Sequence, residues 1–315
     1  MRVPDDRTPK RRAFDRVSAY LNNHRYRLAL YEDRPKWHHV WDVWDTWHED
    51  EGAIAAFAAL RDERGSESYG DWATYGLTNL MIKGLMVSLV RQGDVTGYLY
   101  RHVFAHDRYS LWDREDCPGI VKTVRNRVVH YNEGLSSVIF WPDTTLDSVT
   151  FKVEGIGKEA FDIPSLVSNQ GEWLTEVLNG IADRLQAEEQ EHRDSFAGES
   201  LLETVSSLSY PLQQVAIRDD FLLFPSLDEI AESVVRFQEG AEARGYKRGS
   251  EYDELTERLY EDIEVTLGEL RGGGGLGRVQ WDQKAEFLKS RVKELQEFGE
   301  SVDEEFAQPA SKLER

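Results

Sequence analysis

Apolar residues recur every three or four positions over most of this chain, and that spacing restricts it to a mainly helical fold. The clearest case is 37–61, where bulky residues form one stripe: Trp37, Val40, Trp41, Trp44, Trp47, Ile54, Phe57 and Leu60. Further helices are predicted over 12–31, 71–91, 95–109, a segment starting near Pro118, 163–191, 200–209, 227–245, 250–270 and 280–306. The segment 71–91 is apolar almost all round, which is typical of a helix buried on several sides.

One stretch breaks the helical pattern. Residues 137–141 and 148–153 are rich in β-branched and aromatic types, and the residues between them favour a turn. A short edge strand is a further candidate over 161–164. We therefore expect a small β-hairpin at about 136–154, inserted into a helical bundle and followed by a second helical domain.

The composition suggests where the domains begin and end. A polar run over 188–198 is the expected boundary. The predicted parts are a basic arm (1–11), a first helical domain (12–192), an acidic helical domain (199–270), a Gly-rich linker (271–277), an amphipathic helix (278–306) and a tail (307–315). A heptad seam runs along the last helix through Trp281, Ala285, Leu288, Val292 and Leu295. Such a seam either pairs with another chain or packs on its own domain.

Charge is unevenly distributed along the 315 residues, whose net charge is −20. Residues 1–36 hold ten Lys or Arg against five Asp or Glu, a charge of +5, whereas residues 195–315 hold fourteen against twenty-six, a charge of −12. An acidic surface suits solubility in high salt, so a halophilic source and an ordinary acidic cytoplasmic protein both fit. The basic arm either contacts nucleic acid or is a solvated end of the chain. The acidic tail is a candidate surface for a protein partner.

Several classes of protein are excluded. The single cysteine, Cys117, cannot build a disulfide framework or a thiolate metal site, which favours a reducing compartment. The amino terminus lacks a signal-peptide pattern, and no apolar run is long enough to span a membrane. The Gly-rich segment 272–277 lacks the Lys-Ser/Thr ending of a phosphate-binding loop. We expect a cytoplasmic protein without a cofactor.

The strongest candidate for chemistry lies in the helix predicted after Pro118. At about 100° per residue, Asn126 and His130 point together away from the expected core face, and Arg125 lies about 140° from His130. That core face is formed by Val121, Val124 and Val128. A neutral imidazole takes the proton from a ribose 2′-hydroxyl and later protonates the leaving oxygen. A guanidinium binds the phosphate and stabilises its growing charge. These groups suit metal-independent cleavage of RNA.

The spacing Arg-x4-His occurs three times in the chain. Pro35 interrupts the pair Arg34 and His39, and the pair Arg101 and His106 has no Asn after its Arg. The third copy reads Arg-Asn-x-x-Val-His over 125–130. Because its Arg and His diverge on one helix, two copies packed around a two-fold axis would combine their groups at one phosphate.

This motif, on an amphipathic helix followed by a hairpin and another helix, resembles the HEPN superfamily (higher eukaryote and prokaryote nucleotide-binding domains) over 12–192. The resemblance implies a HEPN-like bundle that acts as a homodimeric, metal-independent endoribonuclease in toxin–antitoxin, antiviral defence or RNA-processing settings. The products would be a 2′,3′-cyclic phosphate and a 5′-hydroxyl. The residues carried over as catalytic are Arg125, Asn126 and His130. Many members place a Gly directly after the His, whereas here three residues separate His130 from Gly134. The resemblance therefore does not define the shape of the cleft.

Further residues are candidates for binding the RNA. These are Lys122, Arg127 and Tyr131. Lys122 and Arg127, with the basic arm, would make the cleft locally basic in a chain that is otherwise acidic.

A second interpretation stays open beside the nuclease. The chain also fits a non-catalytic HEPN-like binding or scaffold module for a protein or nucleotide partner. His130 would then cap a helix carboxy terminus, and Arg125 would form a buried ion pair. An exposed motif in a basic cleft favours the nuclease, whereas a buried, ion-paired Arg125 favours the scaffold.

Other groups of residues are weaker candidates. A helical face carries His38, Asp42, Asp45 and Glu49, which fits a divalent metal site or, more simply, a solvated face. His102, His106 and Asp107 could form a functional site, or they could lie on an aromatic helix in which the histidines have hydrogen-bond partners. Cys117 has no base near it in sequence and is expected to be inert. The tryptophan stripe favours a core or a dimer seam over a base-stacking surface.

Overall fold

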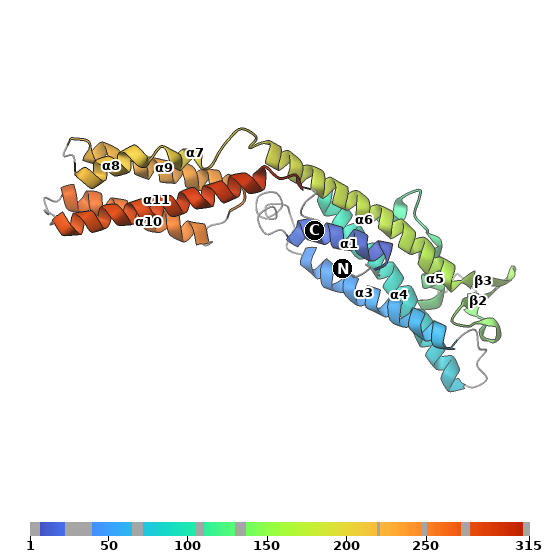
Figure 1. Ribbon diagram of the computed structural model, residues 1–315. Coiled ribbons are helices and arrows are strands. Elements are labelled where there is room, and N and C mark those ends of the chain that lie inside the picture. Colours follow the sequence, from blue (N-terminus) through green and yellow to red (C-terminus); the bar gives the residue numbers. More distant parts are fainter. Residues whose placement is uncertain are drawn as a thin grey trace, which may run out of the picture. The chain divides into compact units, whose positions relative to one another are not determined.

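The computed structural model describes residues 7–22, 40–64, 72–104, 110–129, 137–218, 221–246, 251–271 and 278–310. This part of the chain is mainly helical with one small antiparallel sheet (Figure 1), which confirms the predicted class at that level. Among the helices described, none is both long and apolar enough to cross a bilayer.

Backbone contacts divide the chain into two compact units. Unit 1 comprises Met1–Ser18 and Arg34–Leu185, and unit 2 comprises Ala19–Asp33 and Gln186–Arg315. One boundary falls inside helix α6 (Ile163–Asp194), after Leu185, and another falls inside helix α1 (Pro9–Asn22), after Ser18. The polar run expected to separate two domains, 188–198, covers the last residues of α6 and the turn that follows.

Unit 1 is built around one long helix. Its described elements are most of α1 (Pro9–Asn22), α3 (Val40–Arg64), α4 (Trp72–Val103), the 3-10 turn η3 (Leu111–Asp113), α5 (Ile120–Val129), β1 (Ser137–Ile139), the 3-10 turn η4 (Trp141–Asp143), β2 (Ser148–Val153), β3 (Gly157–Asp162) and most of α6. Helix α4 contacts α3, α5 and η3. The core contains Ile82, Leu85, Met86, Leu89 and Val90 of α4 with buried residues of α3, α5, β2 and α6. α4 is therefore the element on which the others pack.

Helix α4 is longer than the sequence suggests. Separate helices were expected over 71–91 and 95–109, but α4 is continuous through Gln92, Gly93 and Asp94 and ends at Val103. Gln92 is fully buried, accepts a hydrogen bond from Lys10 (3.0 Å) and donates one to Glu51 (2.9 Å). These tertiary contacts outweigh the low helix propensity of glycine at the expected break.

The sheet has three strands in the order β1-β2-β3, all antiparallel. On β2, Val149 and Phe151 are fully buried in the core of unit 1. The turn between β2 and β3 contains Gly155 (φ 80°), and β3 begins at Gly157 (φ 100°); glycine adopts this backbone conformation without steric cost. The edge strand expected over 161–164 instead covers Gly157–Asp162 and stops where α6 begins at Ile163.

Unit 2 contains a ring of four described helices. Helix α7 (Glu203–Ser206) precedes them, and the ring consists of α8 (Ser209–Ile217), α9 (Leu223–Ala243), α10 (Glu251–Arg271) and α11 (Arg278–Phe306). Contacts join α8 to α9, α9 to α10, α10 to α11 and α11 to α8. The five residues of the heptad seam are buried in the core of this unit. The seam is therefore used within the chain itself.

Basic side chains of α1 are paired inside unit 1. Lys10 is 8% exposed, and its Nζ lies 2.6 Å from Glu51 Oε2. Arg11 Nε donates to Asp15 Oδ1 (3.0 Å), and Arg11 Nη1 lies 2.6 Å from His48 Nδ1. Because a guanidinium only donates, His48 Nδ1 accepts this bond and the ring is neutral. Residues 9–11 of the predicted basic arm thus belong to a helix whose charges are engaged by α3 and α4.

Substitutions at two glycines of α4 test the contact beneath η3. A Cβ on Gly93 would overlap the ring of Trp112, whereas a Cβ on Gly84 meets open space. We expect Gly93→Ala to destabilise the protein by about 1–3 kcal/mol, since overpacking forces the indole to move. Gly84→Ala, the matched control, should stabilise it by up to about 1 kcal/mol. Urea unfolding followed by tryptophan fluorescence checks both, and equal effects would contradict the assigned packing.

Protonation of His48 should weaken unit 1 in mild acid. Its pKa is lowered from 6.5 by burial and then by the Arg11 guanidinium, while the carboxylates of Asp15, Asp45 and Glu51 act in the opposite direction. A lowered folded-state pKa means that the unfolded state takes up the proton first, so stability is lost as the pH falls below 6.5. The variant His48→Gln keeps an acceptor for Arg11 but does not titrate.

The measurement is urea unfolding at about pH 7 and about pH 5. Eight of the nine tryptophans lie within the ranges of unit 1, so their fluorescence reports mainly on that unit. The wild type should lose more stability than His48→Gln between these conditions. His192 of unit 2 also has a pKa lowered by burial, so the comparison with the variant isolates His48. Parallel losses in the two proteins would contradict the prediction.

Candidate functional site

Helix α5 carries the predicted motif, and its position is set by three valines. Val121 and Val124 are fully buried and Val128 is 5% exposed, which confirms the predicted core face. The helix contacts α4 and β1. This burial turns the polar residues of α5 toward the flanks of the helix.

Arg125 and Asn126 lie together on such a flank. Both are half-buried, and Arg125 Nη1 donates a hydrogen bond to Asn126 Oδ1 at 2.9 Å. A guanidinium has five N–H donors in a planar fork, a geometry that matches phosphate oxygens. The bond to the amide engages one of these donors and orients the fork.

Two predicted site residues fall beyond the described segment. Residues 130–136 lie outside the described residues, and these include His130 and Tyr131. The described part of α5 ends at Val129, directly before the histidine. The divergence of Arg125 and His130 therefore stays a prediction from helical geometry.

Arg127 is directed to the sheet. Its Nη1 lies 2.5 Å from Glu159 Oε2 of β3, and its side chain is 16% exposed. The guanidinium also lies 5.8 Å from the ring centre of Phe151 and 5.7 Å from that of Phe161. These contacts hold α5 against the inner side of the sheet, so binding of RNA by Arg127 would have to displace an ion pair.

Lys122 remains on the surface of α5. Its Nζ lies 5.7 Å from the ring centre of Trp112, and the side chain is exposed. Trp112 is itself held by a 2.7 Å hydrogen bond from Nε1 to Asp94 Oδ1. This cation–π contact positions an accessible ammonium group, which is compatible with its predicted role in phosphate binding.

Metal binding gains no support from the described residues, among which no group of three or more His, Cys, Asp or Glu side chains is placed to hold an ion. His38 lies outside them, while Asp42 and Asp45 are exposed on α3. Glu49, 70% exposed in its side chain, lies 3.5 Å from Arg91 Nη2. The solvated-face interpretation accounts for these three carboxylates.

The other weak candidates have structural surroundings of their own. His102 Nδ1 donates to the carbonyl of Tyr98 at 2.9 Å, and its ring lies 4.1 Å from the tyrosine ring. His106 and Asp107 lie outside the described residues. Burial raises the pKa of the Cys117 thiol, which disfavours the reactive thiolate.

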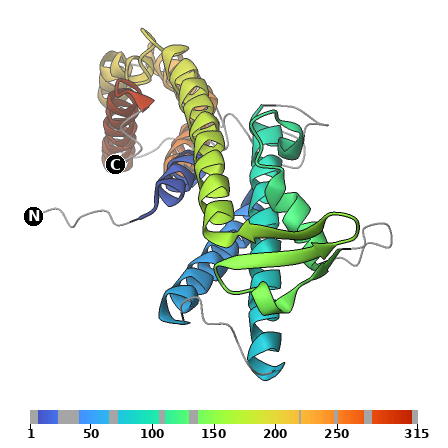
Figure 2. The same cartoon turned by 90° about the vertical axis from the view of Figure 1, so that its right-hand side faces the viewer.

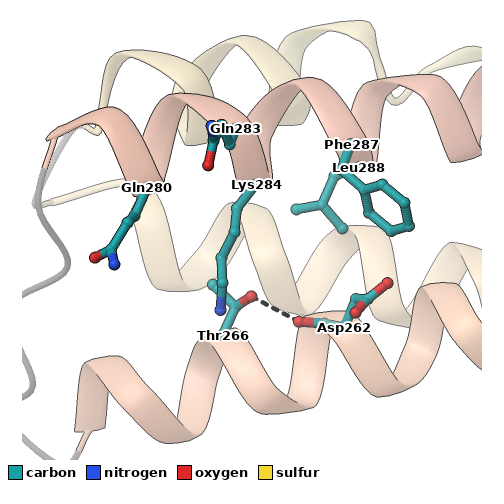
Figure 3. A pocket seen from close by; sticks show the side chains of 7 residues that line it. All are labelled: Asp262, Thr266, Gln280, Gln283, Lys284, Phe287 and Leu288. Carbon is teal, nitrogen blue, oxygen red and sulfur yellow. Dashed lines mark hydrogen bonds between the residues drawn. The ribbon is translucent and has the colours of Figure 1, made fainter.

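Unit 2 contains a cavity of about 510 Å³ between α10 and α11 (Figure 3). Its lining is Asp262, Thr266, Gln280, Gln283, Lys284, Phe287 and Leu288. Thr266 Oγ1 donates to the backbone carbonyl of Asp262 (2.6 Å), so the hydroxyl is engaged by a hydrogen bond within α10. The described lining includes no histidine or cysteine, and α5 is the better candidate for chemistry.

Comparison with known proteins adds no relative: no family model matches this chain, and no curated protein or solved structure matches it. The assignment of a site therefore rests on the residues and their geometry.

Sequence reasoning missed Glu159, the partner of Arg127. The residue lies in β3, and the expected strand began two residues later. The sequence over 157–162 offered no signal for it, because polar and apolar residues do not alternate there: the charged Lys158 and Glu159 are adjacent, as are Ala160 and Phe161. The alternation appears only in the exposure of β3, which places Glu159 and Phe161 on one face.

The Arg127–Glu159 pair is open to a double-mutant cycle. Arg127→Met keeps the aliphatic packing on the two phenylalanine rings, and Glu159→Gln keeps the shape of its partner. We expect a coupling free energy of about 1 kcal/mol, near the upper end for partly exposed pairs. Urea unfolding of the four proteins gives the value, which should shrink in high salt. A coupling indistinguishable from zero would mean that the pair does not hold α5 on the sheet.

Proposed function

We propose that this protein is a metal-independent endoribonuclease that acts as a homodimer. One arrangement supports this above all: α5 buries its three valines and carries Arg125, hydrogen-bonded to Asn126, on a half-buried flank that ends directly before His130. The resemblance of this motif to HEPN nucleases supplies the class of reaction.

The reaction would proceed by internal transfer within the RNA. His130 removes the proton of a ribose 2′-hydroxyl, and the 2′-oxygen forms a bond to phosphorus as the bond to the 5′-oxygen breaks. The protonated imidazole then donates its proton to that leaving oxygen. Arg125 binds the phosphate and stabilises its increased negative charge, while Asn126 orients the guanidinium. The products are a 2′,3′-cyclic phosphate and a 5′-hydroxyl.

A dimer follows from the directions of the two side chains. On an ideal helix continued through His130, Arg125 and His130 would diverge by about 140°, so a single copy would not aim both at one phosphate. Two copies of α5 related by a two-fold axis bring the arginine of one subunit to the histidine of the other.

A non-catalytic binding or scaffold module is the second candidate. It is favoured by the ion pair that engages Arg127 and by the net charge of −20, which opposes binding of a polyanion. In that function α5 would form a surface for a protein or nucleotide partner.

Cleavage of RNA in the presence of EDTA distinguishes the two functions. The wild type should cut single-stranded RNA and leave 2′,3′-cyclic phosphate ends, whereas His130→Ala should remain folded and lose cleavage. Arg101→Ala is the matched control, because Arg101 begins another Arg-x4-His sequence in unit 1 and should retain activity. Full cleavage by His130→Ala, or no cleavage by the wild type at any salt concentration, would contradict the nuclease.

Mixing two inactive variants tests the shared site. A heterodimer of Arg125→Ala and His130→Ala subunits contains one site with both groups intact. Random mixing should therefore restore about a quarter of wild-type activity. Absence of restoration in a mixture that forms heterodimers would indicate that each subunit supplies both groups itself.

A further inference from the structure

The sheet of unit 1 has an outer face opposite the core. In β3 the exposure alternates: Lys158 and Ala160 are exposed, while Glu159 and Phe161 are half-buried toward the core side. In the register of the sheet, Lys152 of β2 lies directly opposite Lys158, and Thr150 lies opposite Ala160. Figure 2 views the sheet with α4 and α5 behind it. We define the outer face by Phe140, Lys152 and Lys158.

Two lysines directly opposite each other on a sheet repel. Lys152 is exposed, and the Lys158 side chain is 53% exposed. The Nζ of Lys158 lies 3.9 Å from the ring centre of Phe140 and 2.6 Å from Asp143 Oδ2. One nearby carboxylate thus offsets one of the two charges. Lys152 is then the cation of this pair whose charge Asp143 does not offset, and an anion bound on this face would offset it.

Aromatic rings adjoin the two lysines. Phe140 lies beneath Lys158, and Trp141 follows it directly in the chain. The Trp141 ring lies 4.1 Å from that of Tyr75 at the start of α4, with the ring planes inclined by 55°. All three aromatic residues are half-buried, so each retains accessible surface. Aromatic rings beside lysines suit single-stranded nucleic acids, whose bases stack while their phosphates pair with cations.

We propose that the outer face of the sheet, with Trp141 and Tyr75, binds single-stranded RNA. The choice of RNA as the occupant rests on the proposed nuclease function, and a single strand is favoured because a duplex hides the faces of its bases. β3 is an edge strand, and its adjacent residues Lys158 and Glu159 project to opposite faces. Since Glu159 contacts Arg127, an RNA strand passing the edge of β3 would lead from the outer face toward helix α5.

Binding is measured on the full chain carrying His130→Ala, which should bind RNA without cutting it. The probe is a fluorescent single-stranded RNA of mixed sequence, with the same RNA in duplex form as a competitor. In this background, Lys152→Gln with Lys158→Gln should lower the salt dependence of binding. The slope of log K against log salt should fall by about 1.4, or about 0.7 for each lost phosphate contact. The matched control is Lys289→Gln with Lys293→Gln, two exposed lysines of α11 in unit 2, which should leave the slope unchanged.

A second variant acts in the opposite direction. Asp143→Asn removes the carboxylate that pairs with Lys158 and should tighten binding of the single strand several-fold. Because Asp143 is 46% exposed in its side chain, this change is compatible with a folded protein. Trp141→Ala, checked for folding by circular dichroism, should weaken binding without changing the salt slope. Unchanged binding in both the lysine and the Asp143 variants, preference for the duplex, or no binding at all would overturn the proposal.

The two proposals fail in distinguishable ways. If the wild type does not cut RNA but binding depends on Lys152 and Lys158, the proposed RNA-binding surface is supported and the proposed nuclease activity is contradicted. If the wild type cuts RNA and the lysine substitutions change neither binding nor cleavage, the proposed nuclease activity is supported and the proposed RNA-binding surface is contradicted.

Discussion

Burial of the valine stripe of α5 is the interaction on which the rest of unit 1 depends. Val121, Val124 and Val128 enter the same core as the apolar residues of α4, β2 and α6. Because this core fixes the rotation of α5 about its own axis, it decides which side chains remain available on the flanks. It directs Arg127 to the sheet and leaves Arg125 beside Asn126. The arrangement of the proposed site is thus a consequence of apolar packing, which the polar contacts then refine.

Much of the helical architecture could be predicted because apolar periodicity directly reflects burial of one helix face. The valine face of α5 was predicted for that reason, whereas the strand over 148–153 was predicted from its β-branched and aromatic residues. The break expected after Arg91 is absent because Gln92 is held by Lys10 and Glu51, contacts that join residues distant in sequence. Helix α8 was missed because it is short and contains Pro211, although proline is tolerated in a first helical turn. Local sequence patterns do not show where tertiary contacts compensate for residues of low helix propensity.

The candidate site was predictable in part and for a different reason. Residue type and spacing identify Arg125 and Asn126, since the chemistry of a guanidinium and an amide is intrinsic to them. The partner of Arg127 was not predictable from α5 alone, because Glu159 is brought to it by the register of β3. Likewise, the charge of 1–36 indicated a basic arm, whereas Lys10 and Arg11 are engaged by Glu51 and Asp15. Net charge counts residues, but the electrostatic surface depends on which of them remain unpaired after folding.

The alternation along β3 has a consequence for how this protein tolerates insertions. Glu159 projects toward α5 and Lys158 projects away from it, one residue apart on the same strand. A slip of β3 by one residue would exchange the two faces. A lysine would then oppose Arg127, and a carboxylate would stand on the outer face, so one deletion would reverse the charge on both sides of the sheet. Homologues of this protein should therefore differ in length at the turn over 154–156 only where the pairing of β2 with β3 is preserved. The length of β3 itself should stay constant.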